Sequence, residues 1–275
     1  ADIGVPGERS NAPIAVLLDY DGTISLRDVG DELMRTFVAD QAAVAEMDDR
    51  YNAGDIGSRD LMAWDMEMLP DDPALLRAHA AQVPQDAGLV GLVALCRAHG
   101  IPVEVVSDGL GFYVGSNLGS LGLADLPVAT NRNLVSGGAA GLSFPYGHPT
   151  CTVCGTCKRE RVRAHQDSGR LVVFVGDGPS DRYAAWHADI TFAKGSLRAW
   201  CESADVAIEP WQRLDEVTAW LGSSLASGEL PSDAAGVGRW RSARTRREPA
   251  FICGPEAGLE RSPGPMDPAS IGGLP

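Results

Sequence analysis

Three short apolar runs along the chain are each followed by a loop of glycine and acidic or hydroxyl residues. The runs are Ile14–Leu18, Ile101–Val106 and Leu171–Val175. Predominantly apolar segments of this length are typical of strands buried on both faces of a parallel sheet. We therefore predict an α/β fold, a Rossmann-like parallel sheet sandwiched by helices. Because ligands bind beyond the carboxyl ends of such strands, the three loops should meet at one edge of the sheet.

The segment between the first two runs has a different pattern. Its apolar residues recur at helical spacing, beginning with Val29, Leu33 and Phe37. This spacing indicates helices that bury one face. We predict a small helical cap at residues 26–85, inserted after the first strand, and a core formed by residues 13–25 and 86–221.

Weaker patterns complete the expected fold. Ile190–Ala193 and Val206–Ile208 are predicted as further strands, and Arg213–Leu225 as a closing helix. The β-prone and glycine-containing segment 128–144 favours a hairpin or flap. From residue 222 the chain is rich in Gly, Pro, Ser and Ala, which predicts a flexible, disordered C-terminal tail over 222–275. Its arginines are interpreted as a solvated segment: Arg239, Arg241, Arg244, Arg246 and Arg247.

The charge of the chain limits its partners. The 275 residues include 37 acidic and 23 basic side chains, giving a net charge of −14. This charge argues against nucleic acid and against an anionic membrane surface as partners. No stretch approaches the roughly 20 apolar residues that cross a bilayer, and Ala1–Pro13 lacks the regions of a signal peptide. We expect a cytoplasmic protein without a membrane partner.

Asp19 and Asp21 directly follow the first predicted strand. Alternate residues at a strand end project to the same side, so both carboxylates can serve one reaction. In phosphate-ester hydrolysis one carboxylate attacks phosphorus, while the other protonates the leaving oxygen and later activates water. Such chemistry needs a cation to neutralise the phosphate, and Asp177 and Asp181 are suitable further ligands for Mg²⁺.

Three other residues favour phosphate binding. Ser107 offers a hydroxyl donor, Gly109 allows close approach of backbone amides, and Lys158 carries a compact positive charge. Each alone has an ordinary explanation, since Asp-Gly is a common turn and lysines are usually on the surface. Their occurrence together, in this order behind predicted strands or at a helix start, favours catalysis.

Four segments resemble the ordered motifs of the haloacid dehalogenase-like phosphatases: Asp19-Tyr20-Asp21-Gly22-Thr23, Ser107-Asp108-Gly109, Lys158, and Gly176-Asp177-Gly178-Pro179-Ser180-Asp181. The predicted cap is similar to the first-type cap of the phosphoserine phosphatase branch. Three further segments most resemble the methionine-salvage enol-phosphate phosphatases of that branch: Phe112–Val114, Cys154–Lys158 and Phe192–Leu197.

This resemblance implies a role for each motif residue. Asp19 would be the nucleophile, which becomes an aspartyl-phosphate, and Asp21 the general acid/base. The phosphoryl group would be held by Ser107, Asp108, Gly109 and Lys158. Mg²⁺ would be held by Asp19, the backbone carbonyl of Asp21 and Asp177, with Asp181 supporting. Dehalogenases of the family lack the second aspartate of the first motif, so Asp21 favours phosphate over halide.

The function expected from these residues is Mg²⁺-dependent hydrolysis of a small phosphorylated metabolite by a monomer or homodimer. A methionine-salvage type of substrate ranks first and an amino-acid or amino-alcohol phosphate second. Arg27, Asp28 and Glu32 are the candidates in the cap for recognising the rest of the substrate. A phosphotransferase that uses the same intermediate, and a non-catalytic zinc-stabilised interaction module, are the alternatives.

The zinc alternative depends on four residues just before Lys158. His148, Cys151, Cys154 and Cys157 are separated by two residues each, as in zinc knots, and four such ligands can close a tetrahedral site. The family resemblance also accounts for this segment as the approach to the third motif. Reversible thiol oxidation is a further possibility.

Overall fold

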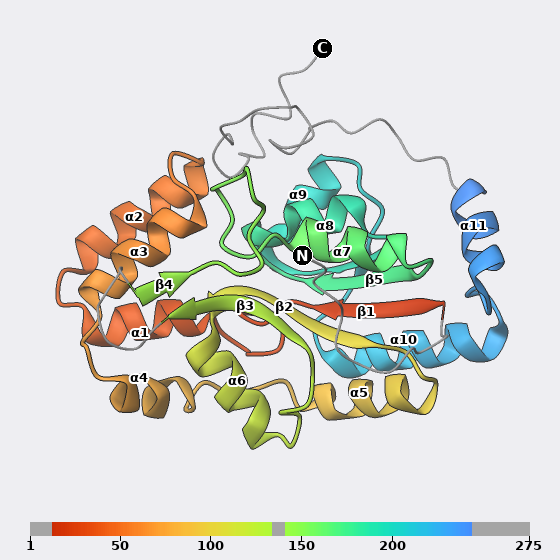
Figure 1. Ribbon diagram of the computed structural model, residues 1–275, viewed down its shortest axis with the longest axis horizontal. Helices are drawn as coiled ribbons and strands as arrows, with labels where there is room; N and C mark the ends of the chain where they lie inside the picture. The colour runs from red at the N-terminus through yellow and green to blue at the C-terminus, as the bar shows by residue number, and fades with distance from the viewer. Residues whose placement is uncertain (1–12, 134–140, 244–275) are drawn as a thin grey trace, which may run out of the picture.

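The computed structural model describes residues 13–133 and 141–243. Its centre is a seven-stranded sheet in the order β4-β3-β2-β1-β5-β6-β7 (Figure 1). The strands are β1 Ile14–Leu18, β2 Val103–Leu110, β3 Val128–Asn133, β4 Leu142–Ser143, β5 Leu171–Gly176, β6 Ile190–Ala193 and β7 Glu209–Pro210. Neighbouring strands pair in parallel except β4, which is antiparallel to β3. The predicted α/β architecture is confirmed.

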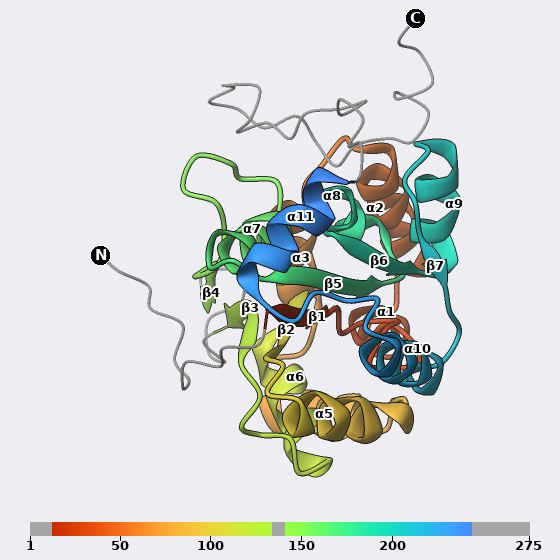
Figure 2. The same ribbon diagram turned by 90° about the vertical axis from the view of Figure 1, so that its right-hand side faces the viewer.

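Helices cover both faces of the sheet (Figure 2). One face carries α5 Gly88–Ala98, α6 Gly111–Ser120 and α10 Leu214–Ser227; the other carries α7 Lys158–Asp167, α8 Arg182–His187 and α9 Gly195–Ser203. Alternate residues of β1 face the two layers. Val16 and Leu18 pack in the same cluster as residues of α5 and α10, whereas Ala15 and Leu17 pack with residues of α7 and α8. A strand buried on both faces has no polar side, which explains its uninterrupted apolar sequence.

The register aligns the ends of the three central strands. Leu18, the last residue of β1, pairs with Val105 on one side and Val175 on the other. The loops after β1, β2 and β5 therefore leave the same edge of the sheet, as predicted. Several boundaries differ from the prediction. The strand β2 covers Val103–Leu110 with a register irregularity, β5 extends to Gly176, and the last strand lies at Glu209–Pro210 instead of Val206–Ile208.

Residues 26–85 are helical, as expected for the cap. The helices are α1 Val29–Phe37, α2 Gln41–Ala53, α3 Ser58–Met68 and α4 Pro73–Ala80. Aspartates begin three of them: Asp28, Asp40 and Asp72 each accept a hydrogen bond from a backbone amide in the first turn. The treatment of the cap as a separate domain stays a prediction.

The cap leaves and re-enters the core at one point. Ser25 and Gln85 form an antiparallel bridge. The amide of Leu26 donates to the carbonyl of Pro84 (2.8 Å), and that of Asp86 donates to the carbonyl of Ile24 (2.7 Å). The two junctions of the cap are therefore hydrogen-bonded to each other.

Helical structure extends into the segment predicted as a tail. The helix α10 ends at Ser227, and α11 covers Ala234–Ser242. Arg241 of α11 forms an ion pair with the buried carboxylate of Asp189 (2.7 Å). For residues 222–242 the expectation of a disordered segment is therefore corrected, as is that of a solvated Arg241, whereas Arg239 is exposed as expected. Residues 244–275, with the other three arginines from Arg244 to Arg247, lie outside the described residues.

The strands β3 and β4 form the predicted hairpin, with Arg132 opposite Ser143. Residues 134–140 between them lie outside the described residues. No helix in the described parts of the chain combines the length and apolar character needed to cross a bilayer.

Candidate active site

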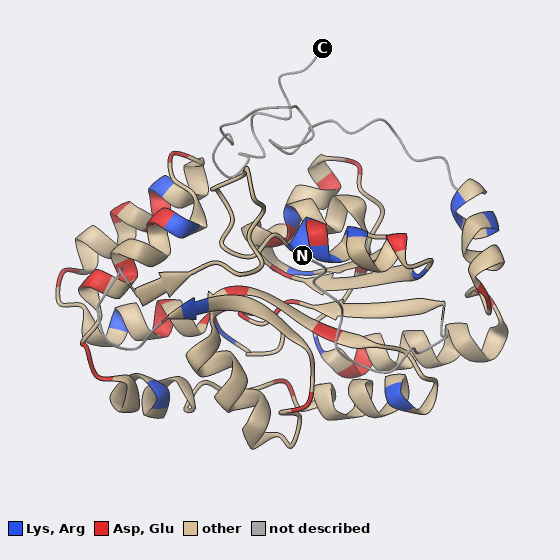
Figure 3. Ribbon diagram, in the orientation of Figure 1, with Lys and Arg blue, Asp and Glu red and all other residues tan. Residues whose placement is uncertain are grey.

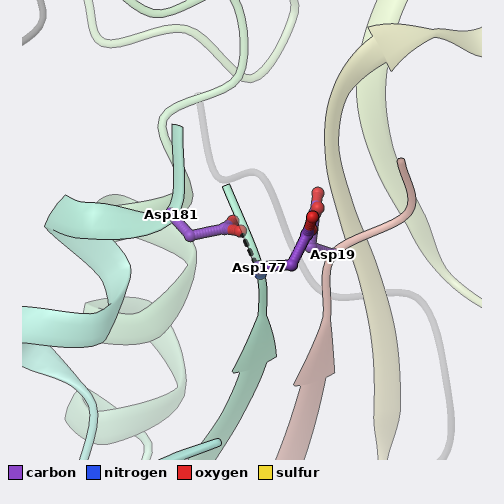
Figure 4. Close-up of side chains that lie close together, drawn as sticks. All are labelled: Asp19, Asp177 and Asp181. Atoms are coloured by element: carbon purple, nitrogen blue, oxygen red, sulfur yellow. Dashed lines mark hydrogen bonds between the residues drawn. The ribbon is translucent and has the colours of Figure 1, made fainter. Parts of the chain in front are cut away.

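Three aspartates from two loops meet at the carboxyl edge of the sheet (Figure 4). Asp19 follows β1, Asp177 follows β5, and Asp181 ends the short 3₁₀ helix Pro179–Asp181. One oxygen of each side chain lies within 4.8 Å of the others. Asp19 and Asp181 are buried. Residues more than 150 positions apart are thus brought together by the parallel register of β1 and β5.

Lys158 lies at the start of α7 and points into this aspartate cluster. Its Nζ atom is 2.5 Å from Oδ1 of Asp19 and 2.6 Å from Oδ1 of Asp181. It also donates to the hydroxyl of Ser180 (2.9 Å). Burial alone would lower the pKa of Lys158, but the charges of Asp181 and Asp19 outweigh it and raise that pKa well above its ordinary value. The lysine is therefore a permanent cation beside the nucleophile candidate.

The aspartate cluster carries more negative charge than Lys158 compensates. Burial, followed by the charge of Asp181, raises the pKa of Asp19 well above its ordinary value and that of Asp177 to about 7. A group of hard carboxylate oxygens with excess negative charge fits a divalent cation such as Mg²⁺. Among the described residues, these three aspartates are the group of potential ligands that lies close enough to hold a metal ion.

Gly22 allows the first and third loops to approach each other. Its φ is +75°, a conformation that favours glycine, and a Cβ atom there would overlap the carboxylate of Asp177. The hydroxyl of Thr23 donates to the same carboxylate (3.0 Å). The motif residues after Asp21 thus serve to pack the first loop against Asp177.

Asp21 lies apart from the three-aspartate group, and both of its oxygens accept hydrogen bonds. The amide of Val29, the first residue of α1, donates to Oδ1 (3.0 Å), and the hydroxyl of Tyr113 donates to Oδ2 (2.9 Å). Burial, followed by the charge of Asp28, raises the pKa of Asp21 to about 8. The side chain therefore holds a proton near neutral pH, as a general acid must. Metal binding through its backbone carbonyl stays a prediction.

The second motif lies beside the first. Ser107 is buried, and its hydroxyl accepts a hydrogen bond from the amide of Gly109 (2.9 Å). Asp108 Oδ1 accepts from the amide of Thr156 (2.7 Å) and from the side chain of Asn131 (3.0 Å). Asp108 thus connects this motif to the segment that leads into Lys158.

Sequence reasoning missed the contribution of three residues: Tyr113, Asn131 and Ser180. Tyr113 stood in a segment that carried the family resemblance, but nothing in that segment indicated a contact with Asp21. Asn131 lies in the β-prone segment 128–144, and Ser180 lies in the fourth family motif, but neither pattern indicated these contacts. The contacts of Tyr113, Asn131 and Ser180 depend on the order of the strands in the sheet and on the path of each loop, which a sequence pattern does not reveal.

Residues of the first, second and fourth motifs line a cavity of about 620 Å³ between the core and the cap, whereas Ser107, Lys158 and Asp181 are not among its lining residues. The core contributes Asp19, Asp21, Asp108, Gly109 and Asp177 to its lining. The cap contributes four more aspartates and a tyrosine: Asp28, Asp31, Asp48, Asp65 and Tyr51. Figure 3 shows acidic residues on the cap helices α1, α2 and α3, which carry three of these aspartates.

The four cap aspartates form an acidic wall of the cavity. Burial, followed by neighbouring carboxylates, raises the pKa of Asp28 to about 7, Asp31 to about 6 and Asp65 to about 8, and also raises that of Asp48. None of the four forms an ion pair with a Lys or Arg among the described residues. Arg27, a candidate for recognising the substrate, also lines the cavity and pairs with Glu32 (2.8 Å); its role in recognition stays a prediction.

The zinc site predicted at His148, Cys151, Cys154 and Cys157 is not supported and is corrected. No metal-ligand group that includes these residues is found in the described parts of the chain. The segment instead contacts the cap through its backbone: Arg59 donates to the carbonyls of Cys154 (2.9 Å) and Cys151 (3.1 Å). Nδ1 of His148 accepts a hydrogen bond from the amide of Thr150 (3.2 Å).

Comparisons with known proteins agree with this geometry. A family model described as haloacid dehalogenase-like hydrolase matches residues 16–185. A 2-hydroxy-3-keto-5-methylthiopentenyl-1-phosphate phosphatase of Bacillus velezensis is 24% identical over 232 residues, which cover 78% of this chain and 97% of that protein. A protein of the same name from an Exiguobacterium species is 26% identical over 213 residues, covering 75% and 96%.

Solved structures show the same fold. A phosphoserine phosphatase determined with a phospho-aspartyl intermediate analogue superposes with a TM-score of 0.57 at 20% identity, covering 76% of this chain and 99% of that one. A probable phosphoserine phosphatase from Vibrio cholerae superposes with a TM-score of 0.58 at 21% identity, covering 82% and 69%.

Proposed function

Because this chain belongs to the haloacid dehalogenase-like hydrolase family, we propose that it is a Mg²⁺-dependent phosphomonoesterase acting on a small phosphorylated metabolite. The observation that carries this proposal is the pairing of buried Asp19 with Lys158 at 2.5 Å, beside a cavity that Asp19 and Asp21 both line. The names of the relatives, which are phosphatases of a phosphorylated small molecule, support it.

Each side chain has a separate task in the proposed reaction. An oxygen of Asp19 forms a bond to phosphorus while the bond from phosphorus to the ester oxygen breaks, and Asp21 gives its proton to that oxygen. Water then transfers a proton to Asp21 and its oxygen to phosphorus, which releases phosphate and restores Asp19. Lys158 neutralises part of the phosphoryl charge throughout. Asp19, Asp177 and Asp181 would hold Mg²⁺, which neutralises further charge on the phosphoryl oxygens.

Hydrolysis of an aryl phosphate in the presence of Mg²⁺ tests this proposal. Asp19→Asn removes the nucleophile and should lower kcat/KM by about 10³-fold or more. Asp167→Asn, at an exposed position at the other end of α7, is the matched control and should keep wild-type turnover. Wild-type turnover by Asp19→Asn would show that the nucleophile is assigned wrongly.

The identity of the ester is a separate question. The relatives' name supports an enol phosphate with an uncharged methylthio end. The acidic wall favours the second candidate, an amino-alcohol phosphate, because an ammonium group would compensate Asp28, Asp31, Asp48 and Asp65. A substrate with a remote carboxylate would meet like charges there.

Phosphate esters of equal length with an ammonium, neutral or carboxylate end distinguish these candidates. We expect kcat/KM to be highest for the ammonium ester and lowest for the carboxylate ester. The double variant Asp48→Asn/Asp65→Asn should raise KM for the ammonium ester by about tenfold, equivalent to about 1.4 kcal/mol, and leave the neutral ester within about twofold. A preference for the neutral thioether ester that survives in this variant would exclude the amino-alcohol candidate.

A further inference from the structure

Asp21 is held between the core and the cap by two donors. The hydroxyl of Tyr113, on α6 of the core, is 2.9 Å from Oδ2, and the amide of Val29, on α1 of the cap, is 3.0 Å from Oδ1. Both donor residues are buried, Tyr113 at 2% exposure and Val29 at 0%. Because each carboxyl oxygen of Asp21 accepts a hydrogen bond, the plane of the carboxyl group has a defined orientation.

The tyrosine is suited to donate rather than to accept. Burial, followed by the charge of Asp21, raises the pKa of Tyr113 well above its ordinary value, so the hydroxyl keeps its proton. Its ring is fixed by contacts with Tyr20 and Phe112, at centroid distances of 5.9 and 5.2 Å. A Cβ atom on Gly109 would overlap both the Tyr113 hydroxyl and the Asp21 carboxylate. The second motif therefore leaves the space in which this hydrogen bond forms.

From these contacts we propose that Tyr113, together with the backbone amide of Val29, is a positioning residue that orients Asp21 toward the ester oxygen. This inference rests on the proposed phosphomonoesterase function. In the step concerned, the phosphorus–oxygen bond of the ester breaks, phosphorus bonds to Asp19, and the proton of Asp21 moves to the departing oxygen. Tyr113 itself keeps its proton in this step and acts through its hydrogen bond to Asp21.

This role has a consequence that depends on the leaving group. An aryl oxide with a leaving-group pKa near 7 departs without protonation, whereas the oxide of a primary alcohol must be protonated as it leaves. A misoriented Asp21 therefore slows the hydrolysis of alkyl phosphates and leaves that of aryl phosphates nearly unchanged. Loss of stability or of phosphate binding would slow both classes alike.

The test compares kcat/KM for p-nitrophenyl phosphate and for a primary-alkyl phosphate. In Tyr113→Phe we expect kcat/KM for the alkyl ester to fall about 10- to 100-fold, within the range attributed to general acid catalysis, and that for the aryl ester to stay within about threefold. Asp21→Asn is the reference and should show the same selectivity with a larger loss. In the double variant the two losses should not add, because both act through one proton transfer.

Tyr20→Phe is the matched control. Its hydroxyl is equally buried and bonds to Gln85 (3.0 Å) and Asn117 (2.9 Å), but it makes no hydrogen bond to Asp21. This variant should keep the wild-type ratio of alkyl to aryl kcat/KM. Equal losses for both esters in Tyr113→Phe, or the same ratio in the two Phe variants, would overturn the positioning role.

The contribution of the Val29 amide to positioning Asp21 can be tested separately from that of Tyr113. Val29 is the first residue of α1, where proline is accepted, and Asp28 before it has the extended backbone that a following proline requires (φ −63°, ψ 123°). Val29→Pro replaces the hydrogen of the donating N–H group by a ring carbon, which abolishes the hydrogen bond to Asp21 and should lower the alkyl-to-aryl ratio. Val29→Ala keeps that group and should preserve the ratio; an unchanged ratio in Val29→Pro would contradict the role of the amide.

The outcomes separate this inference from the proposed function. If Asp19→Asn retains turnover, the phosphomonoesterase assignment fails together with the inference. If Asp19→Asn is inactive and Tyr113→Phe lowers kcat/KM equally for both esters, the proposed function stands and the positioning role of Tyr113 fails.

Discussion

At the scale of single residues, Lys158 is the positive charge that pairs with the buried carboxylates of the site. It lies within 2.6 Å of two buried carboxylates, Asp19 and Asp181. Removing one partner of a buried ion pair leaves charge without compensation, which typically costs about 3–5 kcal/mol. Its substitution should therefore affect stability as well as catalysis.

Lys158→Met should abolish hydrolysis and make stability strongly dependent on pH. The pKa of Asp19 and of Asp177 in the folded protein lies above the ordinary aspartate value. A carboxyl group with a raised folded pKa destabilises the protein as pH rises above its unfolded pKa. Without the lysine we expect the variant to be less stable at pH 8 than at pH 5, measured by urea unfolding in a chelator. An equal loss at both pH values would contradict this account.

The sequence alone could predict the acidic residues of the site but not their partners. Asp19, Asp177 and Lys158 occupy positions directly after apolar strands or at a helix start, so their placement follows from local pattern. The bond between Tyr113 and Asp21 joins residues 92 positions apart. It depends on the register of β1 with β2 and on which side of α6 faces the site. Neither can be predicted from a short segment of the sequence.

At the scale of elements, Glu104 fixes the helix that carries Lys158. This buried residue of β2 accepts two hydrogen bonds from Arg161 (2.8 and 3.0 Å) and contacts Nε2 of His165 at 2.7 Å, both on α7. Burial would raise the pKa of Glu104, but the hydrogen bonds from His165 and Arg161, with the charge of Arg161, outweigh it and lower that pKa below its ordinary value. The ionised carboxylate therefore stabilises the contact between strand and helix.

The lowered pKa predicts acid sensitivity. A carboxyl group whose folded pKa is depressed contributes stability above its unfolded pKa, near 4.3, and this contribution is lost as pH falls through the folded pKa. Glu104→Gln should be destabilised at pH 7 by about 3 kcal/mol, and the difference from wild type should shrink below pH 4. Chemical unfolding followed from pH 7 to pH 3 measures it; a constant difference across this range would rule the explanation out.

The elements were predictable where one local signal dominates. The apolar runs predicted β1 and β5, the weaker pattern at Ile190–Ala193 predicted β6, and residues 214–227 form the expected closing helix. The helix α11 was missed because its glycine-containing sequence, Ala234–Ser242, has little intrinsic helical preference. Its anchoring includes the long-range ion pair from Arg241 to Asp189, which no local pattern reveals.

At the scale of the whole molecule, the aspartate cluster connects the loops after β1 and β5. A cation bound between Asp19, Asp177 and Asp181 would bind the folded chain and not the unfolded one, so it should raise the apparent stability by mass action. At 100 times its Kd the ion would add about 2.7 kcal/mol. Thermal unfolding should therefore show a higher Tm with Mg²⁺ than with chelator.

Asp177→Asn should remove most of this Mg²⁺-dependent rise in Tm. Asp189→Asn is a change of the same kind at a buried aspartate that directly precedes β6 and pairs with Arg241. This variant should have a lower Tm with and without Mg²⁺, and the difference between the two Tm values should stay that of the wild type. A rise of equal size in Asp177→Asn would place the ion elsewhere.

The bridge between Ser25 and Gln85 has a consequence for exchanging parts between relatives. Both splice points for the intervening segment lie side by side, so a chimera needs no redesign of the strands, but the transplanted piece must supply the backbone amide that Val29 donates to Asp21. The transplanted piece must still supply an apolar surface, because Leu76 and Ala80 share the core cluster with Val114 and Leu118 of α6. Exchange of residues 26–85 at this bridge should therefore reveal whether substrate preference follows the transplanted segment.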